Sequence, residues 1–221
     1  MLHVVCSAGR SIFFVALVAL LMGAAPARMS DQTVSPSVMV TRFHDALLNA
    51  VKTTSGQGYS ARESAILPVV AASFDTRVMA RIAAGSYWDA LSESERSQLA
   101  EAFADLTTAN YAVRFRAYTG QRFAVLAQQA APQDRMLVRA QIRRGSGEAF
   151  SISYVLEKSA TPLGWSIIDV WLNNTVSELA LRRAEFSPVL REKGGAALIA
   201  DLRSKIAALP KDDAPRAVRV N

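Results

Sequence analysis

The sequence predicts an α+β fold in which N- and C-terminal helices cover a four-stranded antiparallel meander sheet. Changes in the spacing of apolar residues carry this prediction. Apolar residues recur at helical spacing up to residue 119, alternate with a period of two between residues 122 and 172, and return to helical spacing after residue 175. Short turns separate the alternating segments, which is typical of consecutive antiparallel strands. One face of these segments is apolar and the other mixed, as expected when helices cover one side of a sheet.

Three helices are expected before residue 91, over 38–52, 60–72 and 74–84. Pro68 should mark a kink or boundary in the second helix, because proline lacks the N–H that a helix interior uses. Ser73 is expected to cap the third helix at its N-terminus, and Gly85 is expected to end it.

A fourth helix begins with the clearest local signal in the chain. Ser92 precedes Glu95 by three residues, which is the spacing of a capping box at a helix N-terminus. We expect this helix to continue to about Thr119. Its apolar face widens toward the C-terminus, where aromatic residues gather, among them Tyr111 and Phe115.

The four strands are expected at 122–127, 136–143, 150–156 and 165–172. Turn residues separate them at 132–134, 145–147 and 161–164. Two helices should follow, over 175–191 and 195–209, divided by the Gly194-Gly195 pair.

Residues 1–27 have the pattern of a cleavable secretory signal peptide. Arg10 is the only formal charge there, an apolar run follows it, and Ala25-Pro26-Ala27 supplies a small-residue cleavage site. The apolar run is short for a transmembrane helix, which needs about 20 residues, and a retained anchor is the alternative. The expected organisation is a signal peptide over 1–27, a flexible leader over 28–37, one folded domain over 38–209 and a polar tail over 210–221.

Basic residues outnumber acidic ones and give a formal net charge of +6, but they are scattered in ones and twos. No block resembles a nucleic-acid-binding arm, so we expect no nucleic-acid partner. An anionic membrane surface, an acidic partner protein or a merely solvated surface would each account for the charge. The arginines expected on polar faces, where they would serve docking rather than hold an apolar ligand, are Arg77, Arg81, Arg139 and Arg143.

Residues suited to catalysis or metal binding are scarce. The one cysteine, Cys6, and one of the two histidines, His3, lie in the predicted signal peptide, which leaves His44. We expect His44 to be a surface histidine, and Asp169, a carboxylate within a strand, to be satisfied by backbone N–H groups or an arginine. The usual Cys/His zinc site cannot form, and no Gly-rich phosphate loop is present. We therefore expect no enzyme, no catalytic residues, no cofactor and no metal.

Three segments occur in a recognisable order after the signal-peptide pattern. They are Phe74-Asp75…Met79-Ala80…Gly85…Trp88…Ser92, then Phe103…Leu106…Tyr111…Tyr118, then Trp165…Asp169-Val170. This order resembles the MlaC-type family of periplasmic phospholipid-binding proteins, also called the toluene-tolerance family. The run from Asp169 to Ala180 is similar to the hopanoid-associated branch of that family, HpnM. The resemblance covers residues 38–209.

The resemblance implies a periplasmic, monomeric lipid carrier, auxiliary to an ABC transporter, that passes phospholipid or hopanoid between outer- and inner-membrane complexes. It also implies an apolar cavity between sheet and helices, although periodicity alone cannot tell a filled core from a hollow one. A ligand-free periplasmic interaction or adaptor module is the alternative, and an enzyme acting through Asp169 or His44 is a third hypothesis. The expected lipid-binding residues are Phe74, Met79, Phe103, Leu106, Tyr111, Phe115, Val125, Val138, Ala140, Phe150, Ile152, Tyr154, Trp165 and Ile167.

Overall fold

The chain alternates helical and strand regions in the predicted order. The computed structural model describes residues 34–173 and 175–211. Helices α1 (Pro36–Thr53), α2 (Gly58–Ser73), α3 (Thr76–Ala84), the short 3₁₀ helix η1 (Gly85–Ala90) and α4 (Glu93–Arg114) come first. Strands β1 (Arg122–Ala131), β2 (Arg135–Arg143), β3 (Ala149–Lys158), β4 (Trp165–Leu172) and β5 (Val176–Ser177) follow, and then helix α5 (Glu178–Ala207). The predicted signal peptide of residues 1–27, the leader up to residue 33 and the tail from residue 212 lie outside the described residues.

The strands form an antiparallel sheet in the order β1-β2-β3-β4-β5. The predicted antiparallel α+β class is confirmed, but the predicted number of four strands is wrong. The additional strand β5 has two residues, Val176 and Ser177, which pair with Leu172 and Trp171 of β4. Two residues are too few to show an alternating pattern, so the sequence assigned them to the following helix. That helix begins at Glu178 instead.

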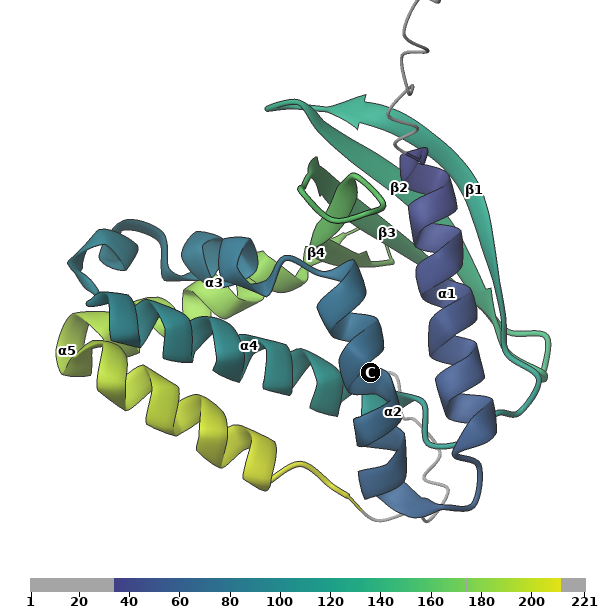
Figure 1. Ribbon diagram of the computed structural model, residues 1–221, viewed down its shortest axis with the longest axis horizontal. Coiled ribbons are helices and arrows are strands. Elements are labelled where there is room, and N and C mark those ends of the chain that lie inside the picture. Colours follow the sequence, from purple (N-terminus) through teal and green to yellow (C-terminus); the bar gives the residue numbers. More distant parts are fainter. Residues whose placement is uncertain (1–33, 174, 212–221) are drawn as a thin grey trace, which may run out of the picture. The chain divides into compact units, whose positions relative to one another are not determined.

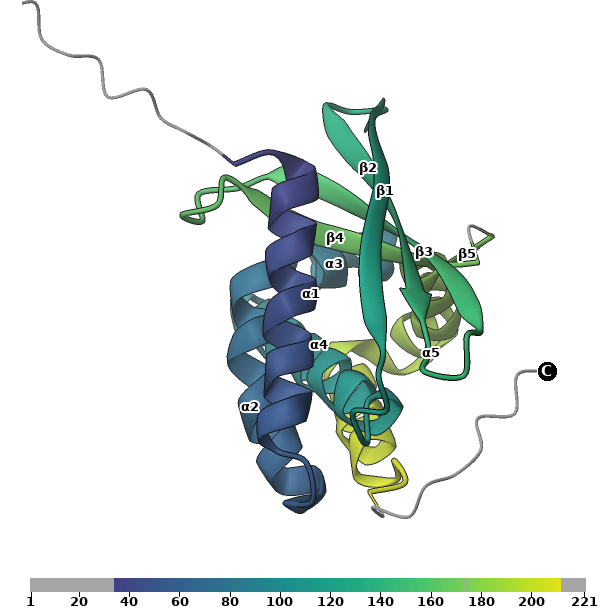
Figure 2. The ribbon, with the colours of Figure 1, turned by 90° about the vertical axis from the view of Figure 1, so that its right-hand side faces the viewer.

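Helix α1 lies along the face of the sheet formed by β1 and β2 (Figures 1 and 2). Its buried stripe includes Met39, Val40 and Phe43, each no more than 2% exposed. These residues recur every three or four positions, so one side of the helix is apolar and faces the sheet. Strand β2 contributes Val138 and Ala140 to the same core, and both are buried as well. This part of the space between sheet and helices is filled.

Helix α4 packs against α2, α3 and α5, and Figure 1 shows α4 and α5 running side by side. The part of α4 up to Leu106 buries Leu99, Phe103 and Leu106. The ring of Phe103 meets the ring of Phe186 in α5 edge to face, with centroids 6.2 Å apart. Edge-to-face contact is a preferred geometry for aromatic pairs in a packed core. The apolar face of this part of α4 is therefore covered by other helices.

Helix α4 ends at Arg114, before the predicted end at Thr119. The buried side chain of Arg62 in α2 explains the earlier end. Its Nε donates to the carbonyl of Ala112 at 2.7 Å, and its Nη1 donates to the carbonyl of Arg116 at 3.0 Å. Carbonyls at a helix C-terminus lack partners within the helix, and a cation there is favourable. The chain leaves the helix at Phe115 with φ −106° and ψ 54°.

The N-cap of α3 is Asp75, and the prediction that Ser73 caps this helix is wrong. The carboxylate of Asp75 accepts from the backbone N–H of Val78 at 2.9 Å. Phe74, which precedes it, is extended and forms a parallel bridge with Ile167 of β4. Phe74 pairs with the sheet and cannot begin the helix, so the cap lies two positions further along the chain than predicted. The bridge fixes the start of α3 against the sheet.

The predicted breaks in helices have different outcomes. Helix α2 continues through Pro68 to Ser73, and Pro68 is exposed. Helix α5 bends where the sequence predicts a division, because Gly194 has φ 77° and a non-helical backbone. At the neighbouring Gly195, an added Cβ would lie 2.6 Å from Cδ2 of Leu91. Gly194 thus permits the bend in α5, and Gly195 permits close packing against the loop before α4.

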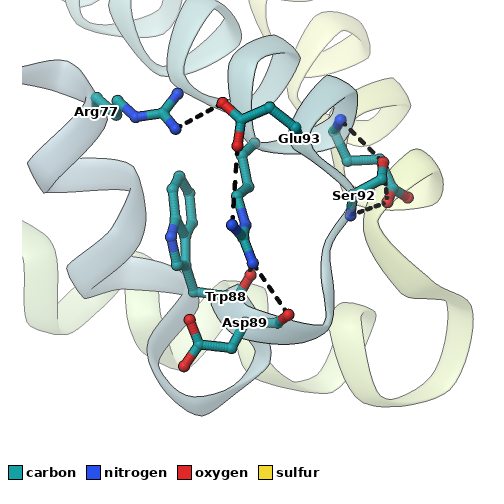
Figure 3. Close-up of polar contacts among 7 residues, drawn as sticks. Arg77, Trp88, Asp89, Ser92 and Glu93 are labelled. Carbon is teal, nitrogen blue, oxygen red and sulfur yellow. Dashed lines mark hydrogen bonds and ion pairs between the residues drawn. The ribbon is translucent and has the colours of Figure 1, made fainter.

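The junction between η1 and α4 contains the predicted capping box (Figure 3). The hydroxyl of Ser92 accepts from the backbone N–H of Glu95 at 3.2 Å, and the Glu95 carboxylate accepts from the N–H of Ser92 at 2.9 Å. Glu93 forms an ion pair with Arg77 at 2.8 Å. The guanidinium of Arg77 also lies 5.8 Å from the centroid of the Trp88 ring. Arg77 is exposed, as expected for a docking residue, but it is engaged within the chain.

Candidate functional site

A pocket of about 340 Å³ lies between the C-terminal half of α4 and strands β1 to β4. Its volume falls within the range of small-molecule sites, about 300–1,000 Å³. Most of its wall is apolar or aromatic. The apolar and aromatic lining residues are Phe74, Met79, Tyr111, Phe115, Phe123, Ile142, Phe150, Ile152, Tyr154, Val170 and Leu172.

The register of the sheet brings the strand residues of the pocket to one face. Ile142 pairs with Phe150 across β2 and β3, and Ile152 pairs with Leu172 across β3 and β4. Directly opposed residues of antiparallel strands share a face of the sheet. An alternating pattern on each strand, combined with this register, therefore produces a continuous apolar wall.

The opposite side of the pocket is formed by aromatic residues at the end of α4. The rings of Tyr111 and Phe115 are stacked with centroids 6.1 Å apart, and Phe115 lies 6.0 Å from Phe123 of β1. These contacts connect the end of the helix to the edge strand. Because α4 ends at Arg114, Phe115 lies at the turn where the chain leaves the helix toward β1.

His44 is buried beside the pocket, and the prediction of a surface histidine is wrong. Its side chain lies in the apolar stripe of α1 next to Phe43, a stripe wide enough to include both positions. The imidazole stacks on Phe123 at 4.1 Å, and its Nε2 shares a hydrogen bond of 2.9 Å with the hydroxyl of Tyr154. Burial lowers the pKa of His44 to about 3, so the ring is neutral at pH 7.

Burial also raises the pKa of the two tyrosines that line the pocket, Tyr111 and Tyr154. Both phenols therefore keep their protons at neutral pH and act as hydrogen-bonding groups rather than as bases. The hydroxyl of Tyr154 is already bonded to His44. Neutral groups of this kind make an apolar pocket compatible with an apolar ligand, because they add no buried charge.

The polar residues of the pocket include two arginines and a glutamate. Arg114 is in the last turn of α4, and Arg144 follows β2. Arg144 lies 4.7 Å from the Phe150 ring centroid and 3.2 Å from the carboxylate of Glu148. The other polar lining residues are Thr107, Asn110, Gln121, Ser151, Asn173 and Glu178.

Asp169 has the structural role that the sequence predicts. Its Oδ1 accepts from the backbone N–H groups of Val170 and Leu179, at 2.8 and 3.1 Å. Its Oδ2 accepts from the Trp171 indole at 2.8 Å and from the Ser177 hydroxyl at 2.7 Å. These donors satisfy the carboxylate and tie β4 to the start of α5.

A second depression of about 380 Å³ lies on the other side of His44. It shares Gln121 and Phe123 with the first pocket, and its wall also includes Val125. Charged residues from α1 and β1 make it more polar than the first, namely Asp45, Lys52 and Arg122. The apolar pocket is therefore the better candidate for an apolar ligand.

The structure brings together one part of the predicted lipid-binding set and separates the rest. Those that line the apolar pocket are Phe74, Met79, Tyr111, Phe115, Phe150, Ile152 and Tyr154. Those of the packed core outside it are Phe103, Leu106, Val138, Ala140 and Ile167, while Val125 lines the second depression and Trp165 lies at the start of β4. Alternation identifies the face of a residue but not its distance along the strand from a pocket.

Sequence reasoning missed further pocket residues on the same faces. Phe123, Ile142 and Leu172 fall on the alternation pattern that predicted their neighbours, so the signal was present. The polar residues Arg114 and Arg144 gave no such signal, because one or two arginines in a helix or turn have the pattern of a solvated surface.

Across residues 34–173 and 175–211, no group of three or more His, Cys, Asp or Glu side chains is placed to hold a metal ion. In the same part of the chain, every helix is too short or too polar to cross a membrane.

The family model described as MlaC protein matches residues 41–204. The chain belongs to the MlaC family. The predicted family is thereby confirmed, whereas its HpnM branch stays a prediction. A solved structure with a TM-score of 0.69 covers 79% of this chain and 98% of its own, at 21% sequence identity. It is the phospholipid-binding protein from Ralstonia solanacearum in complex with a phospholipid. At this level of sequence identity, the similarity shows a shared fold. No curated protein sequence matches the chain.

Proposed function

We propose that this MlaC-family chain is a phospholipid-binding carrier whose apolar pocket takes the acyl part of the lipid. The observation that carries the proposal is a pocket of about 340 Å³ walled by aromatic and aliphatic side chains from α4 and strands β1 to β4. Family membership and the phospholipid in the Ralstonia solanacearum relative support the same ligand class. The buried histidine and tyrosines beside the pocket are neutral, which suits binding rather than catalysis.

A lipid carrier must bind its lipid about as strongly as a membrane holds it, rather than as tightly as possible. Burying a methylene contributes about 0.8 kcal/mol relative to water. The acyl chains of a bilayer lipid are already out of water, so the pocket competes with the bilayer for the same gain. A mainly apolar wall meets this requirement, and it permits release at a second membrane.

The cargo moves, in this proposal, between outer- and inner-membrane complexes across the periplasm. The signal-peptide pattern of residues 1–27 supports export, and N-terminal sequencing of the exported protein should begin at Arg28. A full-length product retained in the inner membrane would favour an anchored form instead. The cargo is a phospholipid or, by the HpnM-like run after Asp169, a hopanoid.

Mass spectrometry of an organic extract of the purified full chain tests the proposal. We expect a co-purified lipid, and its mass distinguishes a phospholipid from a hopanoid. The protein should also move a labelled phospholipid from donor to acceptor vesicles. A clean extract together with no transfer would overturn the carrier and favour a ligand-free adaptor.

A further inference from the structure

We propose that Arg114 and Arg144 form a phosphodiester site at the apolar pocket, which selects phosphate-bearing lipids over uncharged lipids with the same chains. The inference rests on the proposed carrier function and specifies the part of the cargo that the pocket does not enclose. Both arginines line the pocket, and they reach it from different elements, the last turn of α4 and the turn between β2 and β3.

Arg114 is an exposed lining residue without a carboxylate partner. No hydrogen bond or ion pair joins its guanidinium to another side chain in the part of the chain that the structure describes. A long side chain of this kind can place its methylenes along an apolar wall and keep its charge in water. The partial negative charge at the end of α4 also favours a cation at this position. Arg114 is therefore placed to accept an anion that arrives with an apolar ligand.

Arg144 is held in place by two contacts. Its guanidinium lies 4.7 Å from the Phe150 ring centroid, and its Nη1 lies 3.2 Å from the carboxylate of Glu148. The pair with Glu148 is largely exposed, and an exposed ion pair contributes little energy. A planar guanidinium has five N–H donors, so this contact leaves donors free for a phosphate.

The carboxylate that lines the same pocket, Glu178, does not cancel this charge. Its Oε1 accepts from Arg182 at 2.9 Å, and Arg182 is not a lining residue. The charges of the lining are therefore two guanidiniums and one carboxylate that is already paired. Amide side chains of Asn110 and Gln121 add neutral donors. This combination is suited to a singly charged phosphodiester, which arginine recognises through paired N–H donors.

A competition between lipids that differ only in the phosphate tests the site. Delipidated full chain is mixed with phosphatidylglycerol vesicles that contain a known fraction of diacylglycerol with identical acyl chains. Mass spectrometry of the recovered protein gives the ratio of bound lipids relative to the ratio offered. The variants are Arg114→Gln, Arg144→Gln and the double variant, and each is checked by thermal melting.

The wild-type chain should prefer phosphatidylglycerol, and each single substitution should lower the preference about tenfold, the effect of losing one charge-assisted hydrogen bond. The double variant should bind both lipids nearly equally. Arg143→Gln is the matched control, because Arg143 neighbours Arg144 but is not a lining residue. It should leave the preference unchanged.

The possible failures are distinguishable. An unchanged preference in a folded double variant that still binds lipid would overturn the phosphodiester site and leave the carrier function standing. A wild-type chain that takes up neither lipid would contradict the carrier and the site together. Inorganic phosphate alone should neither bind nor displace the lipid, and displacement that depends on these arginines would identify a free-phosphate site instead.

Discussion

Helix α4 up to Leu106, and the segment from Thr107 through Phe115 just beyond the helix, have the same kind of apolar face and meet different partners. The first segment buries Phe103 and Leu106 in the core, and Phe103 packs edge to face on Phe186 of α5. The second segment presents Tyr111 and Phe115 to a pocket whose far wall is the sheet. An apolar stripe on a helix therefore shows that this side of the helix is covered. Whether the space beneath it is packed or hollow depends on the element that lies opposite.

Truncating an aromatic side chain in each segment should give the largest difference in stability. Phe103→Ala removes a fully enclosed ring, and we expect a loss of about 3–5 kcal/mol in the free energy of unfolding. Phe115→Ala removes a ring that already borders a pocket, and we expect a loss of about 1–2 kcal/mol, mainly from its aromatic contacts. Urea unfolding of the lipid-free proteins measures both. Equal losses would contradict the division into a packed segment up to Leu106 and a pocket-lining segment after it.

The pH dependence of stability tests whether the wall at His44 is dry. The folded protein holds this imidazole neutral down to its pKa of about 3, whereas the unfolded chain protonates it below about 6.5. Stability contributed by the neutral ring is complete above pH 6.5 and is lost as the pH falls toward 3. Between pH 6.5 and 4, the wild-type chain should lose about 3 kcal/mol more than His44→Gln.

The Gln side chain of this variant keeps a hydrogen-bonding group near the hydroxyl of Tyr154 but does not titrate. Urea unfolding at several pH values gives the two profiles. Parallel profiles would show that water reaches His44 in the folded protein.

Ala140→Trp tests the filled part of the sheet. The sequence pattern placed Ala140 in the lipid cavity, where a larger side chain would displace cargo without unfolding the protein. The structure instead buries it at 2% exposure in the packed core, outside the pocket. We now expect a loss of stability of about 1–3 kcal/mol from overpacking. A variant that melts like the wild type but carries no lipid would show that the cavity reaches this position.

Thr107→Trp tests the hollow part by filling it. Thr107 lines the pocket from α4, and its hydroxyl donates to the carbonyl of Phe103 in its own helix. A bulky ring there should reduce bound lipid about tenfold, equivalent to about 1.4 kcal/mol, while the fold is kept. Glu101→Trp, on the exposed side of the same helix, is the matched control. Equal lipid content in the two variants would place the ligand elsewhere.

The sequence predicted most elements of the fold because periodicity and caps are local. The capping box at Ser92 and the break at Gly194 are present, since each depends on a few neighbouring residues. The end of α4 was not predictable in this way, because it depends on Arg62, which is distant in the sequence. The two-residue strand β5 was below the length at which alternation can be recognised.

The sequence predicted which face of the sheet borders the pocket, but not how far the pocket extends along the strands. Alternation placed Ile152 and Ala140 on the same side of the sheet, and they are direct partners across β2 and β3. One lines the pocket and the other is packed, a difference that depends on which helix lies above each residue. The burial of His44 is a similar case, because its hydrogen bond to Tyr154 joins residues from α1 and β3.

Nuclear magnetic resonance of the lipid-loaded chain tests the central claim most directly. Nuclear Overhauser effects between acyl methylene protons and side-chain protons report which residues touch the ligand. If the ligand occupies the pocket, the acyl chains should contact Tyr111, Phe115 and Ile152, and should not contact Phe103 or Leu106. Contacts to Phe103 and Leu106, with none to Tyr111 or Phe115, would contradict it.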